Sequence, residues 1–269
     1  MKTAPKLTCC ISFSVLVEEF YRSDFEEAVY AFEQQRHEDS GEWGNESNYR
    51  RKGDIDYCLL VALISCLVRG DGDGSAMLKR ATGALLIFMP GVQEIVKLIS
   101  MLQSKFGGKD ARINGKTIKI MSLHGGLSPV EQKKVFQAVG PFEIKIVVST
   151  NVAEASVTIP DVTIVIDSCR VKEIGFNTET QMSSLQTKFA SKDSLRQRRG
   201  RAGRVQAGRC FRIITTNTFQ KLPAYSVPEM ARVPLDNLLL QIASMKLSES
   251  CFQILARCPD PPDVSSGNL

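Results

Sequence analysis

The sequence contains few of the residues from which metal centres and disulfide frameworks are built. It has only two histidines, and its eight cysteines include no C-x-x-C pair, so a zinc site has little support. Single cysteines inside apolar runs are typical of reduced core residues in cytoplasmic or nuclear proteins. No apolar run reaches the roughly 18–20 residues that span a bilayer, and no signal peptide is evident. We therefore expect a cytoplasmic or nuclear protein that has no membrane partner.

Charge is almost balanced over the whole chain but not along it. The net charge is +5 for 269 residues, which is too small to indicate a nucleic-acid partner by itself. Between Arg170 and Arg212, however, eleven Lys or Arg residues stand against three Asp or Glu, whereas residues 17–56 are acidic. A local basic stripe fits a polyphosphate or nucleic-acid partner, although on charge alone a solvated basic face is the simpler interpretation.

From residue 81 onward, short apolar strands alternate with helical segments. Strands that are near-continuous Val, Ile and Leu runs indicate an α/β fold, in which helices cover both faces of a parallel sheet. Ligands of such sheets bind beyond the carboxyl ends of the strands. The expected strands cover residues 83–90, 117–123, 143–150, 162–168 and 208–214, and the expected helices cover 91–106 and 128–139.

The pattern divides the chain into three parts. Residues 1–80 are expected to form an N-terminal extension: a strand, an acidic helix, a polar mobile loop over 37–53 and an apolar helix that packs on the next domain. Residues 81–222 form the α/β domain. Residues 223–269 form a helical tail.

The octet QRRGRAGR, residues 197–204, is the most unusual stretch of the chain. If it is helical, Gln197, Arg201 and Arg204 share one face. Each glycine costs a helix interior about 1 kcal/mol relative to alanine, so close approach of a ligand or second domain is expected. A guanidinium group fits phosphate oxygens, and an arginine finger delivers such charge to a transferring phosphoryl group. On the octet alone, a basic RNA-binding helix or a localisation signal is an equal alternative.

A second polar cluster, STNVAEASVTIPD at residues 149–161, directly follows an expected strand. Its hydroxyl and amide groups suit phosphate contacts that do not read base identity. Helix capping by Thr150 or Asn151 is the alternative. The arginine octet about forty residues later favours the phosphate interpretation.

Together these segments resemble the DEAH/RHA-type superfamily 2 ATP-dependent RNA helicases. Residues 149–168 resemble motif V and residues 197–213 motif VI, and the resemblance extends from residue 81 to about 262. It implies a RecA-like (P-loop NTPase-like) parallel sheet, a strand hairpin between the two motifs, and a helical tail leading toward a winged-helix domain. Further matches are motif IV at 83–95, the segment after it at 122–136, and the hairpin stretch at 168–185.

The resemblance also implies roles in nucleotide binding. Phe136 would stack on adenine, although a core phenylalanine on an amphipathic helix is the alternative. Asp161 would approach the ribose, but family members often carry the acidic residue one place earlier, where this chain has Pro160. Three residues would reach the γ-phosphate and the attacking water: Gln197, Arg201 and Arg204.

RNA contacts follow from the same resemblance. Thr150 and Asn151 would hold RNA phosphates, and Gly91 would lie near the RNA backbone. Ser156 and Thr158 would couple the RNA contact to the nucleotide state. No base-reading element is present, so we expect backbone contacts without sequence specificity.

ATP hydrolysis in this family needs a phosphate-binding loop and an Asp-Glu pair for Mg²⁺ and water. The sequence contains neither G-x-x-x-x-G-K-[ST] nor DExH. We therefore expect the second RecA-like domain of a monomeric ATP-dependent RNA helicase, inactive alone, whose first RecA-like domain holds most of the Mg²⁺-ATP contacts. Two alternatives stay open: an RNA- or protein-binding scaffold domain of a catalytically inactive helicase-like protein, and a superfamily 2 DNA helicase.

Overall fold

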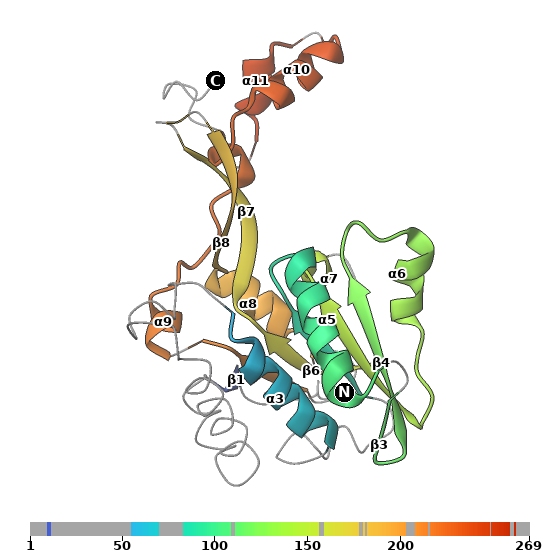
Figure 1. The fold of residues 1–269 in the computed structure, drawn as a ribbon. Coiled ribbons are helices and arrows are strands. Elements are labelled where there is room, and N and C mark those ends of the chain that lie inside the picture. The colour runs from blue at the N-terminus through green and yellow to red at the C-terminus, as the bar shows by residue number, and fades with distance from the viewer. Residues whose placement is uncertain are drawn as a thin grey trace, which may run out of the picture.

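A seven-stranded sheet forms the centre of the molecule (Figure 1). The expected parallel α/β sheet is confirmed, since every neighbouring pair is parallel except β3 with β4. The strand order is β1-β9-β6-β2-β5-β4-β3. The computed structural model describes residues 10–11, 55–69, 83–108, 111–155, 159–177, 180, 182–202, 208–214, 216–247, 249–258 and 261.

The strands follow the apolar runs of the sequence closely. β2, β5 and β6 are buried almost throughout, as expected for strands covered on both faces. The short antiparallel strand β3 at the sheet edge was not expected. The strands are β1 (Cys10–Ile11), β2 (Ala84–Phe88), β3 (Arg112–Ile113), β4 (Lys116–Leu123), β5 (Glu143–Ser149), β6 (Val162–Asp167) and β9 (Arg209–Arg212).

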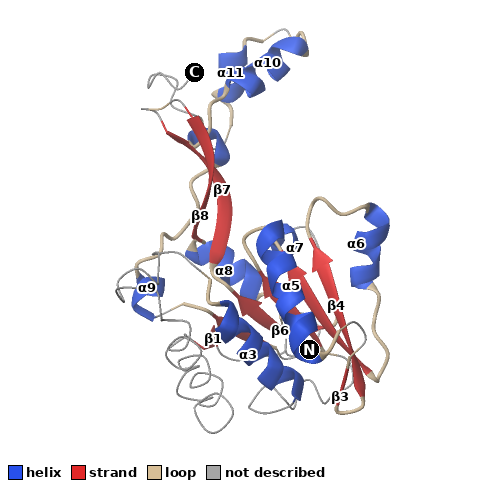
Figure 2. Cartoon of the chain, in the orientation of Figure 1, coloured by secondary structure: helices blue, strands red, loops and turns tan. Residues whose placement is uncertain are grey.

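Helices cover both faces of this sheet (Figure 2). On one face α3 (Tyr57–Arg69) and α5 (Val92–Phe106) pack on strand residues such as Ile87. On the other face α6 (Pro129–Phe136) and α7 (Val152–Ala155) pack on alternating strand residues such as Phe88. The apolar helix expected before residue 70 is therefore confirmed as α3, and it shares a core with the α/β domain.

A two-stranded antiparallel ribbon extends away from the sheet (Figure 1). It consists of β7 (Arg170–Asn177) and β8 (Met182–Phe189), which confirms the expected strand hairpin. Arg232 fixes the chain that returns along it, because its guanidinium donates to the Ile174 carbonyl at 3.1 Å and pairs with Glu173 at 3.1 Å. α8 (Lys192–Arg199) leads from the ribbon back to the sheet.

The last described residues form a small helical cluster beyond the ribbon. Its buried residues, among them Ile242 and Leu255, are separate from the cores beside the sheet. Two helices confirm the expected helical character of the tail, whereas the assignment to a winged-helix region and the three domain boundaries stay predictions. The expected acidic helix and the loop at 37–53 lie outside the described residues. The remaining elements are α9 (Thr216–Gln220), η3 (Glu229–Ala231), α10 (Asp236–Ser244) and α11 (Cys251–Leu255).

Candidate functional site

The polar turn after β5 lies at the carboxyl edge of the sheet. The Thr150 amide donates to the Leu123 carbonyl at 3.1 Å, which joins the ends of β5 and β4. The Thr150 and Asn151 carbonyls then accept from the amides of Ala153 and Glu154, and so begin α7. Asn151 is exposed and Thr150 is largely buried. The two predicted phosphate contacts thus occupy the edge where ligands of parallel sheets bind.

The arginine octet does not form one helix, contrary to the helical interpretation. α8 ends at Arg199, with Gly200 as its C-cap, and Arg201 lies in the turn that follows. The exposed side chain of Gln197 donates to Asp193 at 2.9 Å. Arg204 lies outside the described residues, as do Ser156 and Thr158 of the polar cluster.

One residue of α7 accepts hydrogen bonds from two arginines of the octet. The Arg201 guanidinium donates to the backbone carbonyl of Glu154, and Arg198 Nε donates to the Glu154 carboxylate at 2.8 Å. The turn after β5 and the arginine segment, which are about forty residues apart in sequence, are therefore in direct contact.

Arg198 is fixed on several sides in the interior. Its Nη1 donates to Asp167 Oδ1 at 2.9 Å and to the Arg170 carbonyl at 3.2 Å, and its guanidinium carbon lies 5.1 Å from the centre of the Phe88 ring. The residue is only 1% exposed. Burial alone would lower the pKa of Arg198, but the carboxylates of Asp167 and Glu154 outweigh burial and raise that pKa above its ordinary value. Arg198 therefore stays charged.

The sequence did not single out Arg198 or Glu154. The octet resembles an exposed basic patch, and the carboxylates that bury Arg198 lie 44 and 31 residues earlier in the chain. The one sequence feature that could have indicated a partner for Arg198 is Glu154 itself, an acidic residue within the polar cluster that follows β5.

Lys145 pairs with one of the two predicted nucleoside contacts, Asp161, and bonds to the residue that follows the other, Phe136. Phe136, the last residue of α6, is half-buried against the core. Lys145 is fully buried, and its ammonium pairs with Asp161 at 3.1 Å and donates to the Gln137 carbonyl at 3.0 Å. The roles of Phe136 and Asp161 toward adenine and ribose stay predictions.

Gly91 is the N-cap of α5, directly beyond β2. A Cβ atom there would lie 2.8 Å from Glu94 Oε2 and 2.9 Å from Lys172 Cδ, because these two side chains form an ion pair of 2.8 Å beside the glycine. Lys172, a cation on β7, therefore lies beside the predicted RNA contact at Gly91.

The donor set at this edge suits phosphate and does not suit Mg²⁺. Arginine and amide groups donate hydrogen bonds to phosphate oxygens, whereas Mg²⁺ requires oxygen ligands. Arg198 already engages the Glu154 and Asp167 carboxylates. Among the residues that the structure describes, no group of three or more His, Cys, Asp or Glu side chains could hold a metal ion.

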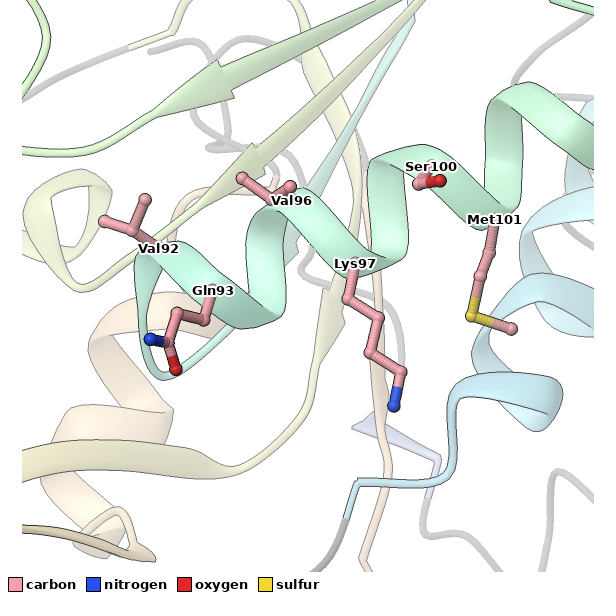
Figure 3. Close-up of a pocket in the computed structure, with 6 residues that line it drawn as sticks. All are labelled: Val92, Gln93, Val96, Lys97, Ser100 and Met101. Carbon is pink, nitrogen blue, oxygen red and sulfur yellow. The ribbon is translucent and has the colours of Figure 1, made fainter.

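A pocket elsewhere contains none of the predicted residues (Figure 3). It follows one side of α5, where Lys97 Nζ lies 4.2 Å from the centre of the Tyr57 ring. The pocket is lined by Val92, Gln93, Val96, Lys97, Ser100 and Met101.

Within the described ranges, no helix has the length and apolar character needed to cross a membrane.

The fold is thus an α/β domain whose sheet joins a hydroxyl- and amide-bearing turn at its carboxyl edge to an arginine segment. Residues 63–206 match the family described as the helicase conserved C-terminal domain. The chain therefore belongs to this family, and it is a C-terminal RecA-like domain of the DEAH type.

Similar proteins support this assignment. The human ATP-dependent RNA helicase DHX29 is 40% identical over 216 residues, which cover 80% of this chain and 15% of DHX29. The human ATP-dependent DNA/RNA helicase DHX36 is 37% identical over 77% of this chain and 19% of DHX36. A crystal structure of the E. coli DExH-box NTPase HrpB matches 80% of this chain and 24% of HrpB, with a TM-score of 0.59 and 28% identity. The chain thus spans less than a quarter of each of these relatives.

Proposed function

We propose that the chain is the second half of an RNA-dependent ATP motor. A first RecA-like domain of the same protein would hold Mg²⁺-ATP, and this domain would close on it and on RNA. The observation that carries the proposal is the contact of Arg201 with the Glu154 carbonyl, because it joins the predicted ATP-binding segment to the predicted RNA-binding turn.

On the nucleotide side, Arg201 and Arg204 would neutralise charge that develops on the γ-phosphoryl group, and Gln197 would orient the attacking water. Phe136 would stack on adenine, and Asp161 would accept a hydrogen bond from the ribose. Mg²⁺ would be held by the other domain, since Glu154 and Asp167 at this edge are paired with Arg198, and Glu94 is paired with Lys172.

On the RNA side, Thr150 and Asn151 would bind phosphate oxygens at the carboxyl edge, with Gly91 near the backbone. Ser156 and Thr158 would relay the nucleotide state. Such contacts hold any sequence, because phosphate oxygens carry no base identity.

A second substrate class has one specific observation in its favour. The similar protein DHX36 is named a DNA/RNA helicase, and phosphate contacts do not separate RNA from DNA. Competition between matched RNA and DNA strands for the full-length protein distinguishes the two, and equal affinity would favour the dual substrate.

The test is RNA-stimulated ATP turnover by the full-length protein, with wild type beside Arg204→Ala. We expect a loss of about three orders of magnitude or more, the effect of an arginine finger. Arg196→Ala is the matched control, because Arg196 has a side chain 65% exposed on α8 and pairs only loosely with Asp193 at 3.4 Å. An inactive wild type that still binds RNA would favour a scaffold and reject the motor. The isolated chain should hydrolyse essentially no ATP.

A further inference from the structure

Glu154 connects three segments of the candidate site. Its amide donates to the Asn151 carbonyl at 2.8 Å, its own carbonyl accepts from Arg201, and its carboxylate accepts from Arg198. α7 has only four residues, too few for a helix that is stable by itself. The position of α7 therefore depends on these contacts.

Arg198 supplies the fixed end of the connection. Besides Glu154 on α7, it contacts Asp167 at the end of β6 and the backbone of Arg170 at the start of β7. A guanidinium group presents its N–H donors in a rigid planar fork, so it can hold two carboxylates in one geometry. Arg198 thus holds α7 and α8 against the sheet and the base of the ribbon.

We infer that Glu154 and Arg198 are positioning residues that couple RNA contact at Asn151 to the placement of Arg201. This inference rests on the function proposed above. When RNA binds at the turn, a shift of Asn151 reaches Arg201 through a single residue, because Glu154 bonds to both. Binding couplings are reciprocal, so nucleotide contact at Arg201 changes RNA affinity by the same factor.

Glu154→Ala is the most direct test, because it removes the carboxylate that anchors α7 on Arg198. Without this anchor α7 no longer holds Arg201 in place, although the backbone carbonyl remains and Arg198 stays paired with Asp167. No buried charge then loses its only partner. Glu154→Gln keeps an acceptor oxygen in the same place and serves as the conservative variant. Arg196→Ala, on the exposed side of α8, is the control.

The measurement is the affinity of the full-length protein for a short fluorescein-labelled oligouridine, with adenylyl imidodiphosphate and with ADP. The ratio of the two dissociation constants is the coupling factor, typically about 5- to 150-fold. We expect Glu154→Ala to bring this ratio close to one and Glu154→Gln to retain part of it. The ratio is the readout and the absolute affinity is not, because loss of the α7 anchor also affects Asn151; Arg196→Ala should match wild type in both quantities. Melting curves check that each variant is folded.

The following results would contradict the proposed coupling between Asn151 and Arg201. An unchanged ratio in both Glu154 variants overturns it, and so does an equal loss of RNA affinity with every nucleotide, which indicates a purely structural role. A wild type that hydrolyses ATP but shows a ratio of one overturns the inference and keeps the proposed function. A wild type that neither binds RNA nor hydrolyses ATP rejects both.

Discussion

Lys145 and Asp161 form an ion pair of 3.1 Å on the sheet face that α6 covers. The Lys145 side chain is fully buried, whereas the Asp161 side chain is 11% exposed. The same ammonium donates to the carbonyl of Gln137, the residue after Phe136. Since a buried charge requires a paired and hydrogen-bonded partner, this pair fixes the loop before β6 relative to the end of α6.

Breaking this pair should cost much more than breaking an exposed one. We expect Lys145→Met to lower the free energy of unfolding by about 3 kcal/mol. The matched control is Lys119→Met on the neighbouring strand, because Lys119 is 39% exposed where it pairs with Glu143; its loss should stay below about 1 kcal/mol. Urea denaturation of the chain measures both. Similar losses for the two variants would mean that the buried Lys145–Asp161 pair contributes no more to the free energy of unfolding than the exposed Lys119–Glu143 pair.

Asp161 should also affect nucleotide choice if its carboxylate accepts from the ribose. Asp161→Asn in the full-length protein is expected to raise KM for ATP by about tenfold or more, the effect of losing a hydrogen bond to a charged group. The turnover number should change little, because ribose binding is the same in the ground and transition states. The specific readout is 2′-deoxy-ATP. Wild type should prefer ATP to the deoxy form, and the variant should lose that preference, whereas a general loss of stability leaves the preference intact.

Much of the fold could be predicted because strands such as β2 and β6 are uninterrupted apolar runs. The burial of charged side chains could not be predicted, because each buried charge is paired with residues distant in sequence. Arg198 looks like its exposed neighbours in the octet until Asp167 and Glu154 are placed around it. The end of α8 at Arg199 was also missed, since helical spacing alone did not show that Gly200 would cap the helix.

Two substitutions at the carboxyl edge should weaken RNA binding in different ways. Asn151→Ala removes a neutral donor, so affinity should fall by about two- to tenfold at every salt concentration. Lys172→Ala removes a cation beside Gly91, so the slope of log K against log[salt] should become shallower by about one. Lys105→Ala, in the last turn of α5, is the control and should change neither. Fluorescence anisotropy over a salt series separates the three, and a changed slope for Asn151→Ala would contradict its assignment as a neutral phosphate contact.

Cys169 offers a reporter for the region around Arg198. Burial, and then the Asp167 carboxylate, raise the pKa of the Cys169 thiol well above its ordinary value, and its amide donates to Asp167 at 2.8 Å. Since the thiolate is the reactive form, iodoacetamide at pH 8 should modify the half-buried Cys258 while Cys169 stays unmodified.

The raised pKa also has a consequence for stability. Above about pH 9 the unfolded chain loses the Cys169 proton while the folded chain keeps it, so the free energy of unfolding should fall as pH rises further. Cys169→Ala should remove this part of the decline. Mass spectrometry of alkylated peptides measures the modification of Cys169 and Cys258. Urea titrations across the alkaline range measure the free energy of unfolding. Alkylation of Cys169 as fast as Cys258 in the folded protein would show that the region around Asp167 and Arg198 opens readily to solvent.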